Sequence, residues 1–284
     1  MLEQLHGLWH WLSSSDSGMK GPLVWAIPLL LAMMVLEALV SALTRDGHYD
    51  ARDLLANLGI GMGNAVANLV WSPLALAMNG LVYAHTPLRM PVDAVWAWVL
   101  LFFLEDLCYY VSHRAEHGLR ILWASHQVHH SSERFNLSIG VRTPWLHGAF
   151  LWVFWVPLAL LGFSPLMIVT QQGLSMVWQF FSHTGHVGRL GPLEHLLSTP
   201  SNHRVHHARN PEYLDRNFGG VLILWDRLFG TYIPEQASPD YGLPGTPRSY
   251  NPFILVLRVW GALLRDTARA PSWRRRLRCL VGPP

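Results

Sequence analysis

Histidines are concentrated in one part of this chain of 284 residues. The chain contains 16 histidines, and most of them fall between positions 113 and 207 in short, regularly spaced groups. On a helix, residues three and four positions apart share one face, so each group can present its imidazoles as one set. The groups are His113 and His117; His126, His129 and His130; His183 and His186; and His203, His206 and His207.

This pattern predicts a metal centre, because neutral imidazole binds iron, zinc and copper well. Ten imidazoles are more than one ion can hold, so the natural expectation is two metal ions. Without a metal, burying these imidazoles would cost desolvation free energy that no evident interaction offsets. The isolated histidines are interpreted as ordinary polar groups, namely His6, His10, His48, His85 and His147.

Two other functions fit part of the pattern. His113, Glu116 and His117 form the signature H-x-x-E-H, typical of a zinc peptidase that uses the glutamate as its general base. That interpretation leaves the other histidines unexplained. A metal transporter would need ligands along its membrane spans, whereas these histidines follow the end of an apolar segment. Both functions remain alternatives to a redox metal centre.

The surrounding elements are those of a membrane protein. Half of the chain (51%) is apolar and only 14% is charged. Apolar runs at 22–43, 54–83 and 92–111 are each long enough to cross a bilayer. The stretch 145–181 is too long for one span, and "GFSP" at 162–165 predicts a turn, giving a hairpin or a re-entrant pair. We expect an all-α, polytopic bundle of about four spans, with a helical cap carrying the dimetal site.

The distribution of arginines predicts the orientation of this bundle. Arg45 and Arg52 lie between the first two spans, and several arginines, Arg114 and Arg120 among them, follow the third. The positive-inside rule therefore places the histidines on the cytoplasmic side. Cys108 and Cys279 show no ligand spacing, so we expect no disulfide framework and a reducing compartment.

Both ends of the chain are predicted to lie at the membrane surface. The first twenty residues can form a short interfacial helix, and 251–266 are amphipathic at helical period. The basic residues gather in "SWRRRLRCL" near the C-terminus, and the net charge is a mild +3. This favours a membrane-surface tail rather than nucleic-acid binding.

The three-part pattern H-x3-H, H-x2-H-H, H-x2-H-H resembles the fatty acid hydroxylase / sterol desaturase superfamily. The lead-in "EDLCYYVSHRAEH" and the segment from "WQFFSHTGH" to "WDRLFGTY" extend the resemblance over roughly 95–235, and are most similar to alkylglycerol monooxygenase-like members. The resemblance implies an N-terminal part at 1–91, a catalytic domain at 92–235 and a C-terminal tail at 236–284.

The superfamily consists of integral membrane non-haem di-iron oxygenases. The resemblance therefore implies two iron ions, with zinc as an alternative occupant in purified protein, and hydroxylation of a lipid C–H bond by O2 and an external reductant. Desaturation and ether-lipid cleavage are close alternatives, since all begin at the same bond. The electron donor is unknown from the sequence, and tetrahydropterin is a candidate implied by the alkylglycerol-type members.

The resemblance also implies roles for individual residues. Eight histidines match the family signature, and the two in "HTGH" are added as predicted ligands; the full set is His113, His117, His126, His129, His130, His183, His186, His203, His206 and His207. His195 is predicted not to bind metal. Asp106, as a histidine partner, and Glu116 and Asn202 are predicted to support the ligands from outside the metal shell.

Overall fold

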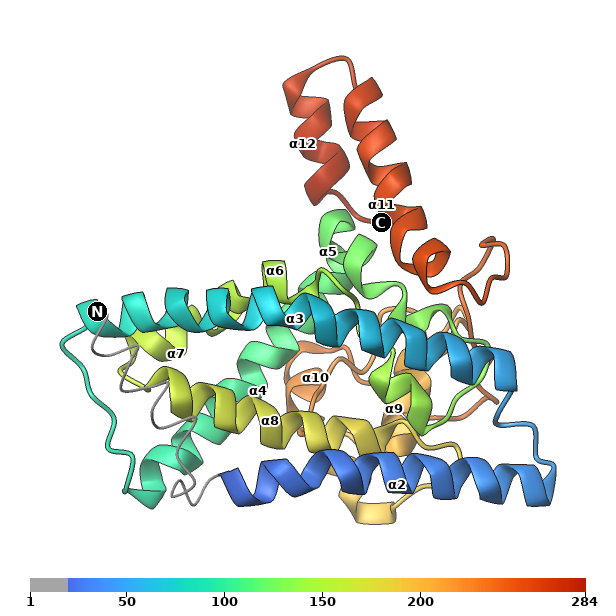
Figure 1. The fold of residues 1–284 in the computed structure, drawn as a ribbon, viewed down its shortest axis with the longest axis horizontal. Helices are drawn as coiled ribbons and strands as arrows, with labels where there is room; N and C mark the ends of the chain where they lie inside the picture. Colours follow the sequence, from blue (N-terminus) through green and yellow to red (C-terminus); the bar gives the residue numbers. More distant parts are fainter. Residues whose placement is uncertain (1–19) are drawn as a thin grey trace.

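The computed structural model describes residues 20–284, and these residues form helices and no strand. The interfacial helix predicted at the N-terminus lies outside the described residues. Figure 1 shows long helices that run nearly parallel or antiparallel to one another, one long helix that crosses them obliquely, and short helices between and beside them. The helices are α2 (Lys20–Thr44), α3 (Ala51–His85), α4 (Val95–Gly118), α5 (Arg120–His126), η1 (His129–Ser131), η2 (Leu137–Val141), α6 (His147–Leu151), η3 (Trp152–Trp155), α7 (Val156–Leu160), α8 (Pro165–Ser182), η4 (Gly191–His195), α9 (Pro200–His207), α10 (Leu224–Phe229), α11 (Pro252–Arg269) and α12 (Trp273–Val281).

Three of these helices are long and apolar enough to cross a membrane: Ala26–Thr44, Ala51–His85 and Val95–Gly118. Large apolar side chains of α2 and α3 point away from the protein, such as Leu36 at 60% exposure and Leu69 at 75%. Such contiguous exposed apolar surface suits lipid rather than water. The predicted all-α membrane bundle is therefore confirmed.

The fourth apolar stretch forms two shorter helical segments, as the hairpin alternative predicts. The first segment runs through α6, η3 and α7, and the second is α8. The chain reverses at Gly162, whose φ of +91° and contact with the Leu88 backbone leave no room for a side chain. Ser164 then caps α8 by accepting a hydrogen bond from the Met167 N–H.

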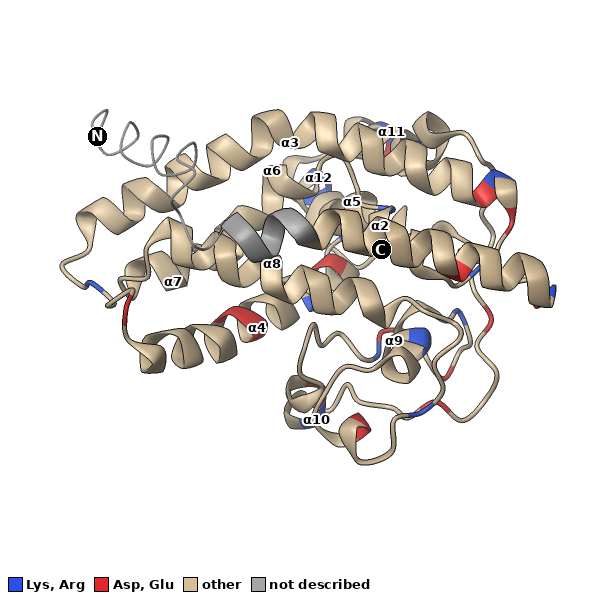
Figure 2. Cartoon of the chain, turned by 60° about the horizontal axis from the view of Figure 1, so that its bottom comes forward, with Lys and Arg blue, Asp and Glu red and all other residues tan. Residues whose placement is uncertain are grey.

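Charged side chains are sparse along α2, α3 and α8 and gather at one end of the bundle and in the cap (Figure 2). We use "the cap" for residues 183–250, which contain η4, α9 and α10. The main apolar core lies between α4, α5, η3, α7 and α8, around Leu101, Trp155 and Phe163. This core packs the first turns of α4 against those of α8.

The amphipathic segment predicted at 251–266 is helix α11, which is confirmed, and α12 follows it. Asn251 caps α11 and Ser272 caps α12, each through its side chain. The two helices form a hairpin that projects from the bundle, nearly perpendicular to α2 and α3 (Figure 1).

Candidate metal centre

Five histidines from four segments form the first cluster, which we call site one. Their ligand nitrogens all lie within 4.8 Å of one another. The Nε2 of His126 lies 3.2 Å from that of His113 and 3.0 Å from that of His130. The members of site one are His113 and His117 of α4, His126 of α5, His130 of η1 and His206 of α9.

Four further histidines form a second cluster, site two, beside the first. The Nε2 of His183 lies 3.1 Å from that of His129 and 2.9 Å from that of His203, whose Nε2 is 3.1 Å from that of His207. The rings of His130 and His207 stack at a centroid distance of 4.4 Å and so join the two sites. Nine of the ten predicted ligands are thus brought together.

The H-x2-H-H spacing explains how each motif serves both sites. In each motif the first and last histidines are four residues apart and point to one site, while the middle histidine points to the other. His126 and His130 belong to site one and His129 to site two. In α9 the assignment is reversed, since His203 and His207 belong to site two and His206 to site one.

The geometry fits two transition-metal ions. Two nitrogens bound to one ion at about 2.1 Å lie about 3.0 Å apart when they are at right angles, and the Nε2 separations are 2.9–3.2 Å. The Nε2 atoms of His117 and His206 are buried and have no hydrogen-bond partner among residues 20–284. A buried nitrogen without a partner is costly unless it binds something, so these two atoms are suited to bind a metal ion.

The opposite ring nitrogens are held by the backbone. The Nδ1–H groups of His113, His183 and His206 donate to the carbonyls of Phe218, Gln179 and Arg216, at 2.9, 2.7 and 3.0 Å. Such bonds fix the tautomer that leaves Nε2 free to bind a metal. Each of these three imidazoles is therefore oriented before an ion binds.

Two carboxylates support other ligands of site one. Asp215 Oδ1 accepts from His117 Nδ1 at 3.3 Å, and Glu116 Oε1 lies 3.4 Å from His126 Nδ1. The predicted supporting role of Glu116 therefore has a structural counterpart. The same Glu116 oxygen lies 3.1 Å from Nδ1 of His147, a histidine that sequence reasoning treated as an ordinary polar group.

Burial keeps the imidazoles outside the spans neutral. It lowers the pKa of His183 to about 4. Burial, followed by the neighbouring imidazoles, holds the pKa of the other such ligands well below the usual value; they are His129, His130, His203, His206 and His207. Neutral imidazole is the form that binds metal, so these groups are ready for an ion at neutral pH.

Asp106 differs from the prediction, because it contacts no imidazole. Its carboxylate accepts from the backbone N–H groups of Val221 and Leu222, at 2.7 and 3.1 Å, and from Trp225 Nε1 at 2.9 Å. A carboxylate can accept several such bonds, and this one faces the 218–225 loop rather than the ligands. Asp106 therefore anchors the loop whose Phe218 carbonyl holds His113.

Asn202 also supports the cap rather than an imidazole. The side-chain amide of Asn202 donates to the backbone carbonyls of Glu194 and Leu197. The backbone carbonyl of Asn202 accepts from Asn217 Nδ2 at 3.1 Å. Asn217 has a left-handed φ of +55°, and this places Arg216 and Phe218 where their carbonyls meet the histidines. Asn202 thus acts on the site through the 215–218 segment.

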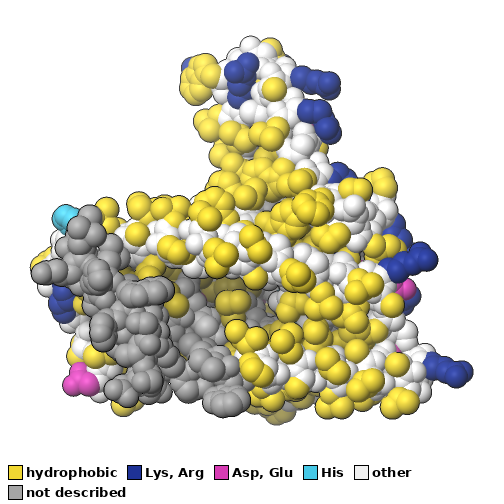
Figure 3. Space-filling model, in the orientation of Figure 1, with side chains coloured by type: hydrophobic (Ala, Val, Ile, Leu, Met, Phe, Trp, Pro, Cys, Tyr) yellow, Lys and Arg dark blue, Asp and Glu magenta, His cyan; other side chains and the backbone are white. Residues whose placement is uncertain are grey.

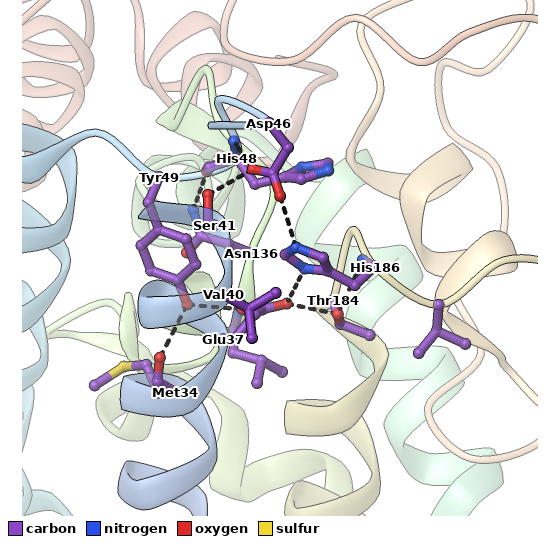
Figure 4. A network of polar contacts seen from close by, with 12 residues as sticks. Met34, Glu37, Val40, Ser41, Asp46, His48, Tyr49, Asn136, Thr184 and His186 are labelled. Atoms are coloured by element: carbon purple, nitrogen blue, oxygen red, sulfur yellow. Dashed lines mark hydrogen bonds and ion pairs between the residues drawn. The ribbon is translucent and has the colours of Figure 1, made fainter. Parts of the chain in front are cut away.

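His186 lies outside both sites and is grouped instead with Asp46 and His48, so its role as a metal ligand stays a prediction. Its Nε2 donates to Asp46 at 2.9 Å, and its Nδ1 lies 3.3 Å from Glu37 (Figure 4). Buried Glu37 also accepts from Tyr49, Thr184 and the Leu137 N–H. His186 is the third residue after His183, but the chain turns after α8, so the ring of His186 faces the end of α2 instead.

A cavity of about 300 Å³ leads from the two sites into the membrane-spanning part. Site one contributes His126 to its wall, and site two contributes His129, His183 and His203. Above them, one face of α3 and one face of α8 line the cavity. These two faces and η3 place tryptophans and amides on the cavity wall: Asn64, Asn68, Trp71, Trp152, Trp155, Gln172 and Gln179.

Comparison with known proteins agrees with this site. Residues 98–231 match the fatty acid hydroxylase family model. The chain is 41% identical to an alkylglycerol monooxygenase of Danio rerio over 77% of this chain and 49% of the relative. It is 36% identical to that of Xenopus tropicalis over 89% and 56%, and 32% identical to an ornithine lipid hydroxylase of Rhizobium tropici over 52% and 45%.

No solved structure matches the chain significantly. The chain spans about half the length of the curated relatives it matches. The matched region 98–231 contains all nine clustered histidines and the 215–226 loop that supports them. The chain therefore carries a domain of the fatty acid hydroxylase family.

Proposed function

We propose that this protein is a membrane-bound di-iron monooxygenase that hydroxylates a C–H bond of a lipid with O2 and an external reductant. One observation carries the proposal: two adjacent all-histidine sites lie at the end of a cavity that enters the membrane-spanning helices. Bound iron would supply the activation of O2 that an unreactive C–H bond requires.

The histidines would hold the ions, and the cavity would hold the lipid. On α8 the lining residues Gln172, Ser175, Met176 and Gln179 repeat at helical spacing and end at His183. Gln172 and His183 are separated by about 16 Å along the helix, at about 1.5 Å per residue. A lipid chain that enters between α3 and α8 therefore has a direct path to the ligands.

The walls also favour productive orientation and exclude water. Trp71, Trp152 and Trp155 line the cavity with broad apolar surfaces, which restrict where a flexible chain can lie. Trp155 is itself fixed, since its Nε1 donates to Glu105 at 3.1 Å. Ser175 donates to the other oxygen of that carboxylate at 2.7 Å.

Ether-lipid cleavage is the second candidate, because hydroxylation of the carbon beside an ether oxygen gives an unstable product. The amides of Gln172 and Gln179 line the cavity and have no side-chain hydrogen bond within residues 20–284. Free amides in a membrane cavity suit a substrate with polar groups, such as a glycerol ether. The relatives named alkylglycerol monooxygenases support the same choice.

Orientation and electron supply complete the proposal. Arg45 follows α2 and Arg52 lies in the first turn of α3, at the end of the bundle where Asp46 contacts His186 of the cap, which supports a cytoplasmic active site. Electrons would reach the centre from a protein partner or a small reductant, for which tetrahydropterin is one candidate.

The test is lipid oxidation under ¹⁸O2. Purified iron-loaded protein in lipid nanodiscs would be given alkylglycerols, free fatty acids and a total lipid extract with reductant, and products would be analysed by mass spectrometry. We expect one ¹⁸O atom in a hydroxylated lipid, or an aldehyde released from an ether lipid, and neither product from His206→Ala. Loss of two hydrogens without oxygen would instead identify a desaturase. Zinc-dependent proteolysis or metal flux without O2 consumption would overturn the proposal.

A further inference from the structure

The α11–α12 hairpin lies across the direction of the membrane spans. In Figure 1 both of its helices run nearly perpendicular to α2 and α3. Because the spans follow the bilayer normal, a perpendicular hairpin runs parallel to the membrane plane. Its height relative to the bilayer and the chemistry of its surface decide whether it contacts lipid.

The height follows from the length of α3. This helix has 35 residues, or about 52 Å, which exceeds a hydrocarbon core of about 30 Å by about 22 Å. Pro252, the first residue of α11, packs on Gly59, about 12 Å from the start of α3 at about 1.5 Å per residue. The charged residues of α3, Arg52 and Asp53, lie in its first turn, so we assign the extra length to this end, and the hairpin then leaves α3 at the level of the lipid headgroups.

One face of α11 packs on the protein, and a second apolar face is open. Leu255, Val256 and Leu263 are buried. Phe253 and Leu264, by contrast, are each 63% exposed. Figure 3 shows apolar side chains continuing from the surface of the spans onto the base of the hairpin, with arginines at its edge. This continuity indicates that the same bilayer covers both surfaces.

The surface of α12 has the composition of an interfacial helix. Trp273, Leu277 and Val281 are exposed and repeat at four-residue spacing. The adjoining faces carry exposed Arg274, Arg275 and Arg278, and none of the three has a carboxylate partner among residues 20–284. Unpaired arginines beside tryptophan and leucine match a helix that lies on an anionic membrane.

We propose that the α11–α12 hairpin is an in-plane anchor that binds anionic phospholipid headgroups, in the leaflet nearest the metal sites, through Arg274, Arg275 and Arg278. Charge complementarity and the continuous apolar surface favour this bilayer over an acidic protein partner. Exposed Trp273 and Phe253 add large apolar side chains of the kind that insert into a bilayer interface. This proposal does not depend on the reaction that the metal sites catalyse.

The anchor is tied directly to a metal-ligating helix. Arg120, the first residue of α5, forms an ion pair with Asp266 of α11. Its backbone N–H donates to the Gly282 carbonyl, after α12, at 2.9 Å. At the other end of α5, Gln127 Nε2 donates to the Leu255 carbonyl at 3.1 Å. Since α5 ends at His126, lipid binding by the hairpin would stabilise the position of a site-one ligand.

A spin label on Cys279 of α12 tests the proposal, with Cys108→Ser removing the other cysteine. Collisions with O2 and with a water-soluble nickel reagent would be compared in nanodiscs with and without phosphatidylglycerol. We expect the label to be shielded from nickel, and more so with the anionic lipid. R274Q/R275Q/R278Q should abolish the effect of the anionic lipid and raise nickel access severalfold. R189Q/R227Q, which alters exposed arginines of the cap, should change neither value.

Two outcomes would overturn the anchor. The first is a Cys279 label that remains equally accessible to nickel in every lipid mixture and in the arginine variant. The second is a label that is shielded only when an acidic soluble protein is added, which would make the hairpin a protein-docking surface. Neither outcome would bear on the oxygenase proposal, because the label reports position without any turnover.

Discussion

Glu116 Oε1 lies 3.4 Å from Nδ1 of His126, so a residue between two ligands on α4 supports a third ligand on α5. In a zinc peptidase the glutamate of H-x-x-E-H would face the ion as a general base. Here its carboxylate meets the ring nitrogen opposite the one that points into site one. The geometry therefore argues against the peptidase interpretation of this motif and for an orienting role.

Replacing Glu116 should weaken metal binding at site one. Glu116→Leu removes the carboxylate that lies 3.4 Å from His126 Nδ1, and loss of such a partner typically lowers metal affinity about 10- to 100-fold. Glu116→Gln retains an oxygen at this position, so its metal affinity should fall much less. Metal retained per chain against increasing chelator measures the effect. Equal retention by wild type and Glu116→Leu would show that the contact does not orient His126.

The two sites should lose their ions separately. His206→Ala removes a ligand of site one and His203→Ala a ligand of site two, so each variant should retain about one of two metal ions. His186→Ala should retain both, because His186 contacts Glu37 and Asp46 instead. Metal analysis of the three purified variants gives the answer. Loss of one ion in His186→Ala would restore it as a ligand.

Spacing along the sequence was enough to predict which histidines cluster, but not what surrounds them. The H-x2-H-H motifs lie on short helical turns, where spacing alone fixes the shared face. Helical spacing does not predict the direction of His186, because the helix ends at Ser182. Sequence could not assign Phe218 or Arg216 either, because they act through backbone carbonyls that every residue has.

The role of Asp106 was missed for a similar reason. Its place about two turns before His113 suggests a partner for a histidine on the same helix, but the side chain points to a loop more than one hundred residues later. The membrane spans, by contrast, were predictable, because apolar length follows directly from bilayer thickness. The hairpin at Gly162 was predictable because Gly and Pro within the apolar stretch favour a turn.

Asp106→Ala should destabilise the protein strongly. It would leave the N–H groups of Val221 and Leu222 and the indole N–H of Trp225 without their acceptor. Each buried unsatisfied donor costs about 1–3 kcal/mol, so we expect a loss of roughly 3–5 kcal/mol. Asp106→Asn keeps one acceptor oxygen, so its free energy of unfolding should fall less. Thermal unfolding in detergent checks the order, and an unchanged midpoint for Asp106→Ala would contradict the anchoring role.

The His186 contacts should make stability depend on pH. Burial disfavours the charged ring, but hydrogen bonds to Asp46 and Glu37 outweigh it and raise the pKa of His186 above its ordinary value of 6.5. A raised pKa stabilises the fold fully below about pH 6.5, and the contribution disappears as pH rises through the folded-state pKa. The free energy of unfolding of the wild type should therefore exceed that of His186→Gln by about 1 kcal/mol near pH 6 and by less near pH 9. A difference in unfolding free energy that increased with pH would contradict the stabilising role of the protonated His186 ring.

The cavity amides should control which lipids react. Gln172 and Gln179 face the cavity on the α8 surface that leads to His183. A hydrogen bond to a substrate hydroxyl contributes about 1 kcal/mol, so Gln172→Leu should raise KM for an alkylglycerol roughly fivefold. KM for a fatty acid that lacks the hydroxyls should stay the same or fall. Met176→Leu, an apolar change on the same face, is the matched control. Equal changes in KM for both lipids would show that the amide shapes the cavity without recognising the polar group.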